Sequence, residues 1–176
     1  MESLKTIQGL SKAGKIFSTI AFVCCIIGAC SCVIGLLCLI IGGSTAADFI
    51  ESAGNISIGT VYASIVIGLI LCISEIIVSW SARLYFIHEL DAGTPFTFDG
   101  ANELLKLGIK TIAVSIAAMI VSYIAQEIFQ HFFANIAEMD WHNSDSVVIG
   151  VVFILISFIL KCGTELAESK KEEENI

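Results

Sequence analysis

Charged residues are scarce in this chain, and arginine and proline are nearly missing. Charged side chains make up 15% of the 176 residues, whereas water-soluble domains carry about 25%. Arg83 is the only arginine and Pro95 the only proline. Hydrophobic residues reach 56%, and the mean hydropathy is +0.90. The composition therefore excludes an ordinary water-soluble domain.

Catalytic and nucleotide-binding motifs are also missing. The chain has three histidines and none of the common metalloprotease or serine-hydrolase motifs. Gly9 and Gly14-Lys15 are spaced as in a phosphate-binding loop, but Ile16 replaces the required serine or threonine. We therefore expect no enzymatic activity, no cofactor and no metal ion. Acidic residues outnumber basic ones by 17 to 9, which argues against direct contact with nucleic acid.

Four long apolar runs fill most of the chain. They cover residues 16–41, 60–86, 104–128 and 147–166, and a helix needs about 20 apolar residues to cross a bilayer. The first run is too long for a signal peptide, whose apolar core has about 7–15 residues. We therefore predict an all-α membrane protein with four transmembrane helices in one polytopic domain, residues 1–176, embedded in the lipid bilayer.

The positions of the basic residues predict the orientation. They gather before the first run, around the centre of the chain and near its end, and neither residues 42–59 nor residues 129–146 contain any. They are Lys5, Lys12, Lys15, Arg83, Lys106, Lys110, Lys161, Lys170 and Lys171. Because basic residues stay on the cytoplasmic side, we expect two helical hairpins with both termini in the cytoplasm. The expected location is the plasma membrane, the inner membrane of a bacterium.

The two ends of the chain carry predictions of their own. On a helix, residues 1–15 separate an apolar side from a basic one. This pattern predicts a short N-terminal amphipathic helix on the inner leaflet, or else a solvated lead-in. Residues 167–176 are a charged cytoplasmic tail, expected to be frayed helix or disordered.

Glu75 lies inside the second apolar run, where an ionisable side chain is costly and is by default a functional candidate. Lys161 in the fourth run and Lys110 near the start of the third are its expected partners. An intramembrane ion pair could simply hold two helices together. Alternatively, Glu75 could couple to a proton or a ligand.

Small residues recur at four-residue steps in the first run, at Cys24, Gly28 and Cys32, with Gly35 close by. This spacing lets membrane helices approach closely, which predicts a packing face and, in one hypothesis, a homo-oligomer. The run holds five of the seven cysteines, so a thiol or metal site is the alternative.

The loop after the third run collects residues that are typical metal ligands. They are His131, Glu138, Asp140, His142 and Asp145. Their spacing matches no known metal site. We expect a solvated acidic loop, and whether it binds cations is left open.

A polar stretch, residues 83–110, separates the two halves of the chain. Asp99 or Asn102 is expected to cap the third transmembrane helix, and the turn before it suits a rigid loop on the cytoplasmic side. We predict a partner-binding loop there. It consists of Thr94, Pro95, Phe96, Thr97 and Phe98.

The same stretch resembles DUF2975, a bacterial family of unknown function. The resemblance rests on the Gly-x-Pro-Phe turn, on the residues that follow it, and on the close of the fourth run before an acidic tail. These residues are Gly93, Pro95, Phe96, Asn102, Leu105, Gly108, Phe158, Gly163, Leu166, Glu168 and Glu172. It implies a four-span membrane protein, often encoded beside a small helix-turn-helix regulator, and no established activity.

Two functions remain from these patterns. The first is a membrane-embedded regulatory or sensor protein of unknown ligand that acts with a cytoplasmic partner, such as a small helix-turn-helix transcription regulator. The alternative is a small oligomeric transporter or channel subunit with Glu75 as its coupling group. A pore should line several spans with polar residues, and here these residues are scattered, which favours the regulator.

Overall fold

The computed structural model describes residues 2–54, 57–92, 97–133, 136 and 144–174. Within these ranges the regular structure is four helices and no strand: α1 (Glu2–Gly54), α2 (Ile58–Ala92), α3 (Phe98–Phe132) and α4 (Ser144–Glu174). Each contains a segment long and apolar enough to cross a membrane. These segments are Ser11–Gly43, Ile58–Asp91, Phe98–Phe132 and Asp145–Leu166. The predicted all-α membrane protein with four spans in contact with a bilayer is confirmed.

The start of α3 differs from the prediction. The hydroxyl of Thr97 accepts a hydrogen bond from the backbone N–H of Gly100 at 3.0 Å, so Thr97 is the N-cap. The prediction that Asp99 or Asn102 caps the helix was wrong, because both residues lie inside it. Polar residues outside a bilayer can still be helical, and α3 therefore begins well before the apolar run at residue 104.

The other three helices are also longer than their apolar runs. α1 continues from Glu2 into the first apolar run without forming a separate N-terminal helix. It bends at Gly43, whose φ of 49° lies in the left-handed region that glycine tolerates best. α4 is helical to Glu174, so the predicted tail continues the helix through most of its length.

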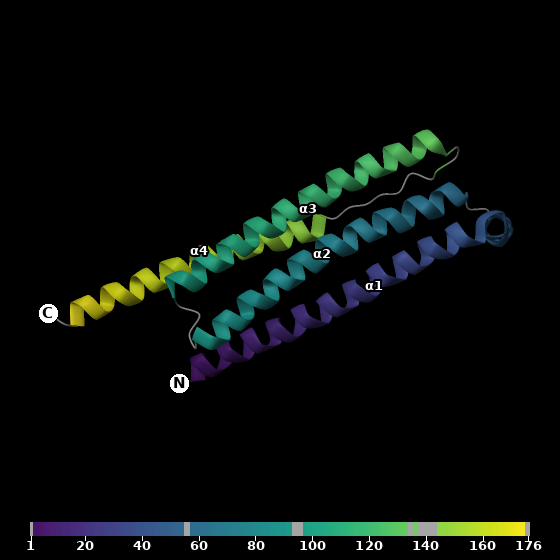
Figure 1. The fold of residues 1–176 in the computed structure, drawn as a ribbon. Helices are drawn as coiled ribbons and strands as arrows, with labels where there is room; N and C mark the ends of the chain where they lie inside the picture. Colours follow the sequence, from purple (N-terminus) through teal and green to yellow (C-terminus); the bar gives the residue numbers. More distant parts are fainter. Residues whose placement is uncertain (1, 55–56, 93–96, 134–135, 137–143, 175–176) are drawn as a thin grey trace.

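The helices form an open array rather than a closed bundle. α1 packs on α2, α2 on α3 and α3 on α4, and no other pair of helices packs closely along the described residues (Figure 1). Both chain termini lie at the same end of this array, which we call the terminal end. The opposite end, where α1 bends and α3 finishes, is called the loop end.

The exposed surface is apolar, and much of the interior is polar. Large side chains such as Phe17, Ile41 and Ile159 are exposed. The buried residues are mostly small or carry a hydroxyl, among them Ser74, Ser79, Ser115, Ser122 and Ser157. This distribution fits a hydrocarbon surrounding, in which helices associate through small residues and hydrogen bonds rather than through apolar burial.

Two glycines set the contact between α3 and α4. A Cβ atom on Gly108 would lie 2.8 Å from the carbonyl oxygen of Gly150, so only glycine allows this approach. Further along, Ser157 donates a hydrogen bond to the carbonyl oxygen of Ala101 at 2.6 Å. These contacts place the start of α4 beside the middle of α3, and α4 extends beyond the terminal end of the array (Figure 1).

Candidate functional site

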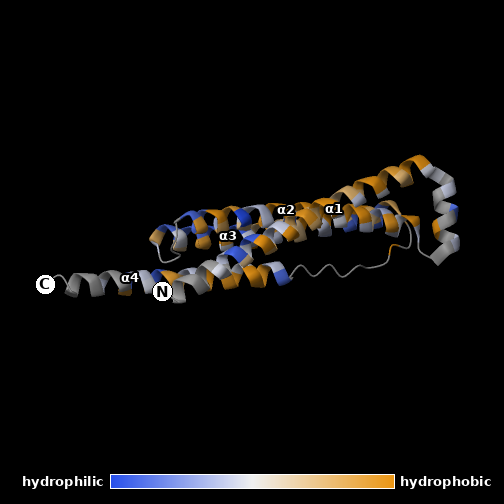
Figure 2. Ribbon diagram, turned by 90° about the horizontal axis from the view of Figure 1, so that it is seen from below, coloured by the Kyte–Doolittle hydropathy of each residue, from blue (hydrophilic) through white to orange (hydrophobic). Residues whose placement is uncertain are grey.

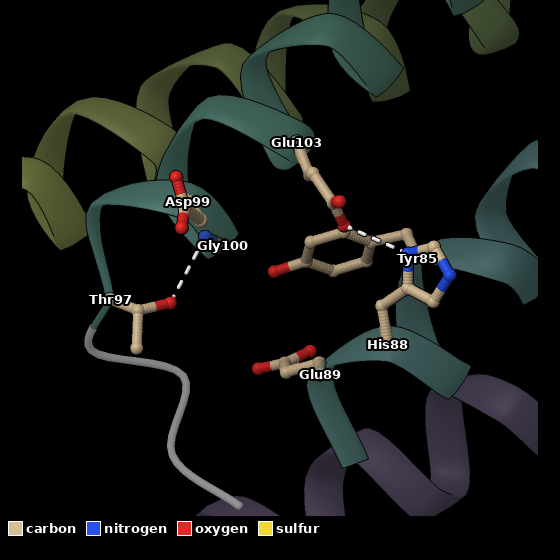
Figure 3. Close-up of a pocket in the computed structure, with 7 residues that line it drawn as sticks. All are labelled: Tyr85, His88, Glu89, Thr97, Asp99, Gly100 and Glu103. Carbon is tan, nitrogen blue, oxygen red and sulfur yellow. Dashed lines mark hydrogen bonds and ion pairs between the residues drawn. The ribbon is translucent and has the colours of Figure 1, made fainter. Parts of the chain in front are cut away.

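A cavity of about 90 Å³ lies at the terminal end, between the last turns of α2 and the first turn of α3. Its lining is rich in hydrogen-bond acceptors (Figure 3). The lining residues are Tyr85, His88, Glu89, Thr97, Asp99, Gly100 and Glu103. Drug-sized ligands occupy pockets of about 300–1,000 Å³. This cavity therefore suits a single polar group, such as the end of one side chain.

The floor of the cavity belongs to the apolar core at this end. Tyr85 is only 7% exposed and clusters with Ala82, Leu104 and Leu107. Its ring meets Phe86 edge to face, with centroids 5.3 Å apart. The core therefore fixes the ring, and the hydroxyl of Tyr85 points into the space between the acidic side chains (Figure 3).

Polar contacts join three helices around this tyrosine. Glu89, one turn after Tyr85, is half-buried, and the hydroxyls of Tyr85 and of Ser11 in α1 interact with its carboxylate. On the other side, Nδ1 of His88 lies 3.4 Å from a carboxylate oxygen of Glu103. The cavity is thus assembled from α2 and α3 and braced by α1.

The charge of the lining is negative. Three carboxylates face one histidine, and no lysine or arginine belongs to the lining residues. The negative charge of Asp99 is partly compensated by the helix dipole, because Asp99 lies in the first turn of α3, where the dipole favours an acidic residue. Because carboxylates and hydroxyls accept hydrogen bonds, the arrangement suits a cationic donor such as an ammonium or guanidinium group.

The predicted partner-binding loop meets the cavity at one residue. Thr97 lines it, and Phe98 begins α3 next to it. Thr94, Pro95 and Phe96 lie outside the described residues.

Glu75 is hydrogen-bonded to a serine and not to either expected lysine. Ser146, at the start of α4, donates to Oε1 of Glu75 at 2.7 Å. Lys110 donates to the hydroxyl of Ser81 at 2.7 Å, and Lys161 is exposed. The structure therefore places a hydroxyl where the sequence suggested an ion pair, because the position of α4 along α3 brings Ser146 to the level of Glu75.

The small residues of the first run pack against α2 of the same chain. A Cβ on Gly28 would lie 3.1 Å from the sulfur of Cys72, and one on Gly35 would touch Ile65. Cys32 likewise lies over Gly68, whereas Cys24 is exposed. Most of the predicted packing face is thus used within the chain.

The remaining candidate ligands give no assembled site in the part of the chain that is described. All seven cysteines are free. No three histidine, cysteine or acidic side chains of the described ranges are arranged to hold a metal ion. His131 and Asp145 are exposed, and Glu138, Asp140 and His142 lie outside the described residues.

The sequence analysis missed most of the cavity. Tyr85, His88 and Glu89 share one face of α2, as their spacing of three and four residues requires. Asp99 and Glu103 have the same relation on α3. The spacing could have identified each face, but not that the two faces meet.

Compared with protein-family models, with curated proteins and with solved structures, the chain matches none. The resemblance to DUF2975 therefore stays a prediction.

Proposed function

We propose that this chain is a regulatory or sensor protein of the plasma membrane that holds a cytoplasmic partner at its terminal end. In this proposal both termini and the cavity face the cytoplasm, because every basic residue lies on that side. The first turns of α1 then lie at the inner leaflet, where Lys12 and Lys15 would meet anionic lipid headgroups.

The acidic cavity is the observation that carries the proposal. Three carboxylates around the buried hydroxyl of Tyr85 present acceptors to a donor arriving from outside the bilayer. A transcription regulator has a basic surface for DNA, and an arginine or lysine beside that surface could enter the cavity. The gene setting implied by the resemblance, a small helix-turn-helix regulator, supplies a partner of this type.

Co-purification from solubilised membranes tests the proposal, with a small helix-turn-helix regulator of the kind that the resemblance implies as the partner. The test variant is Asp99→Asn with Glu103→Gln, which removes two charges from the cavity. Hydrogen bonds to charged groups contribute about 1.5–3 kcal/mol, and about 1.4 kcal/mol is tenfold in affinity. Retention of the regulator should therefore fall at least about tenfold.

The matched control is Glu127→Gln, which removes an exposed acid from the far end of the same helix. It should retain the regulator as the unmodified chain does. Equal retention by all three proteins, or no retention by the unmodified chain, would remove the proposal.

A small oligomeric transporter or channel subunit remains the alternative, favoured by the hydrogen bond that Ser146 of α4 donates to Glu75 inside the membrane-spanning segment of α2. This function requires Glu75 to change its protonation or its ligand during transport. Ion flux into proteoliposomes that is lost in Glu75→Gln and kept in Glu127→Gln would support it. Flux that is absent from the unmodified chain, or unchanged in Glu75→Gln, would exclude it.

A further inference from the structure

The uncharged segment of α4 does not lie level with those of the other helices. Gly14 lies against Phe86, and Lys110 bonds to Ser81, so Lys15, Arg83 and Lys110 mark nearly one level on α1, α2 and α3. Lys161 is the corresponding residue of α4, the first charge after its uncharged stretch, residues 146–160. However, α3 and α4 run antiparallel with Ser157 beside Ala101, so Lys161 lies level with residue 97. That level is about 13 residues, or about 20 Å, beyond Lys110 toward the terminal end.

This position puts apolar and charged residues side by side. Residues 146–160 of α4 carry no charge, yet they run beside residues 98–112 of α3, which hold four charged side chains. Figure 2 shows the hydrophobic stretch of α4 alongside this more hydrophilic end of α3. Leu155 and Ile159 are 57% and 69% exposed there. If the other three helices are centred in a bilayer, much of this apolar surface lies outside the hydrocarbon, which is unfavourable.

The residues of α3 that contact α4 belong to one seam, which continues toward the loop end. Along this seam buried residues recur at alternating steps of three and four, the heptad spacing of helix packing. They include Ala101, Leu104, Gly108, Thr111, Ser115, Ala118 and Ser122. α4 repeats the same spacing with small residues of its own. These are Ser146, Gly150, Ser157 and Thr164.

Moving α4 by two heptads, about 21 Å, toward the loop end keeps small residues facing small residues. Gly150 would face Ser122, and Ser157 would face Ser115. Lys161 would lie level with Thr111, next to the level of the basic residues Lys15, Arg83 and Lys110 on the other helices. The uncharged segments, residues 111–126 of α3 and 146–160 of α4, would then coincide. Ser122 supports this second position independently, because its buried hydroxyl has no hydrogen-bond partner in the described structure.

We propose that α4 occupies two registers on α3, the one seen here and one shifted by two heptads toward the loop end. The first is stabilised by the contact between Gly108 and Gly150 and by the bond from Ser157 to Ala101. The second is stabilised by the match of the uncharged segments in the bilayer. This proposal depends on helix packing alone and not on the proposed partner.

The two registers differ at the terminal end. In the register seen here, residues 161–174 of α4 extend past the start of α3. In the shifted register these residues run beside the first turns of α3, and positions 170 and 171, both lysine, lie level with residues 101 and 102. The tail would then compete for the acidic cavity, so the register of α4 would regulate whether the cavity is open.

Disulfide cross-linking of the full-length chain in membranes tests the two registers. In a background without native cysteines, Ala101→Cys with Ser157→Cys reports the register seen here, and Ser115→Cys with Ser157→Cys reports the shifted one. Gly28→Cys with Cys72 retained is the positive control, because these positions touch between α1 and α2. Ser115→Cys with Thr164→Cys is the negative control, since these positions are apart in both registers.

Intramolecular cross-linking of both reporter pairs, well above the negative control, is the expected result. If only one reporter pair cross-links while the positive control does, α4 has a single register and the proposal is overturned. Should a reporter pair fail to fold, a chain that keeps only Cys162 gives a second measurement. Labelling by an impermeant maleimide from the cytoplasmic side should show two phases, and a single phase would equally overturn the proposal.

Discussion

Replacing Gly14 with alanine tests how tightly α1 must approach α2 to support the cavity. The added Cβ would lie 2.5, 2.6 and 2.9 Å from ring atoms of Phe86, all well inside normal contact. Phe86 packs against the core that holds Tyr85, so its ring must move away from Gly14 and disturb its contacts with that core. Overpacking of this kind costs about 1–3 kcal/mol. We expect the lower end, about 1 kcal/mol, because a ring can rotate more easily than backbone can shift.

The matched control is Gly9→Ala in the same helix, where an added Cβ meets nothing within 4 Å. Both substitutions gain the same helix propensity, about 0.5–1 kcal/mol over glycine. The difference between the two variants therefore isolates the contact with Phe86. Since 1 kcal/mol shifts the melting temperature of a chain of this size by about 2–4 °C, Gly14→Ala should melt that much below Gly9→Ala.

Thermal unfolding in lipid nanodiscs measures this difference through the fluorescence of Trp80, whose ring lies 5.4 Å from that of Phe22 across α1 and α2. Adding Phe86→Leu to Gly14→Ala should recover part of the loss, because residues in contact do not have additive effects. Equal melting temperatures for the two alanine variants would refute the packing of α1 against α2 described above.

The same unfolding measurement applied to three further substitutions distinguishes contacts that stabilise the fold from contacts that contribute little. Thr97→Ala should destabilise by about 0.5–2 kcal/mol, because α3 loses its N-cap, and Thr97→Ser should not; equal stability of both would exclude the cap. His88→Ala should change stability by less than about 0.5 kcal/mol, since the pair with Glu103 is exposed, and a larger loss would show a tighter ion pair. Ser11→Ala should cost about 0.5–1.5 kcal/mol by removing the hydroxyl that interacts with the Glu89 carboxylate, and no change would show that α1 does not brace the cavity.

The number of helices could be predicted from the apolar runs because hydrocarbon restricts the backbone to few structures. Inside a bilayer every backbone N–H and C=O needs a partner within its own segment, which a helix provides. The helix ends followed less well. Outside the bilayer that constraint disappears, and Thr97 rather than Asp99 begins α3 through a local hydrogen bond that the run of apolar residues does not encode.

The contacts between helices could not be predicted from periodicity. In water, a helix shows its buried face as an apolar stripe, but in lipid both the buried and the exposed faces can be apolar. The informative residues are instead small or polar. Gly28 was found in this way, whereas Gly108 and Gly150 were not recognised as a contact because they lie on different helices. Glu75 was identified as unusual for the same reason, but its partner depended on the register of α4.

The side of the membrane on which the cavity opens is the central claim, and cysteine labelling tests it most directly. In a background without native cysteines, Asp99→Cys places a thiol at the cavity and Glu127→Cys places one near the loop end, both at exposed positions. On intact cells an impermeant maleimide should label residue 127 at once and residue 99 only after the membrane is opened. Labelling of residue 99 on intact cells would contradict the orientation and remove the cytoplasmic partner with it.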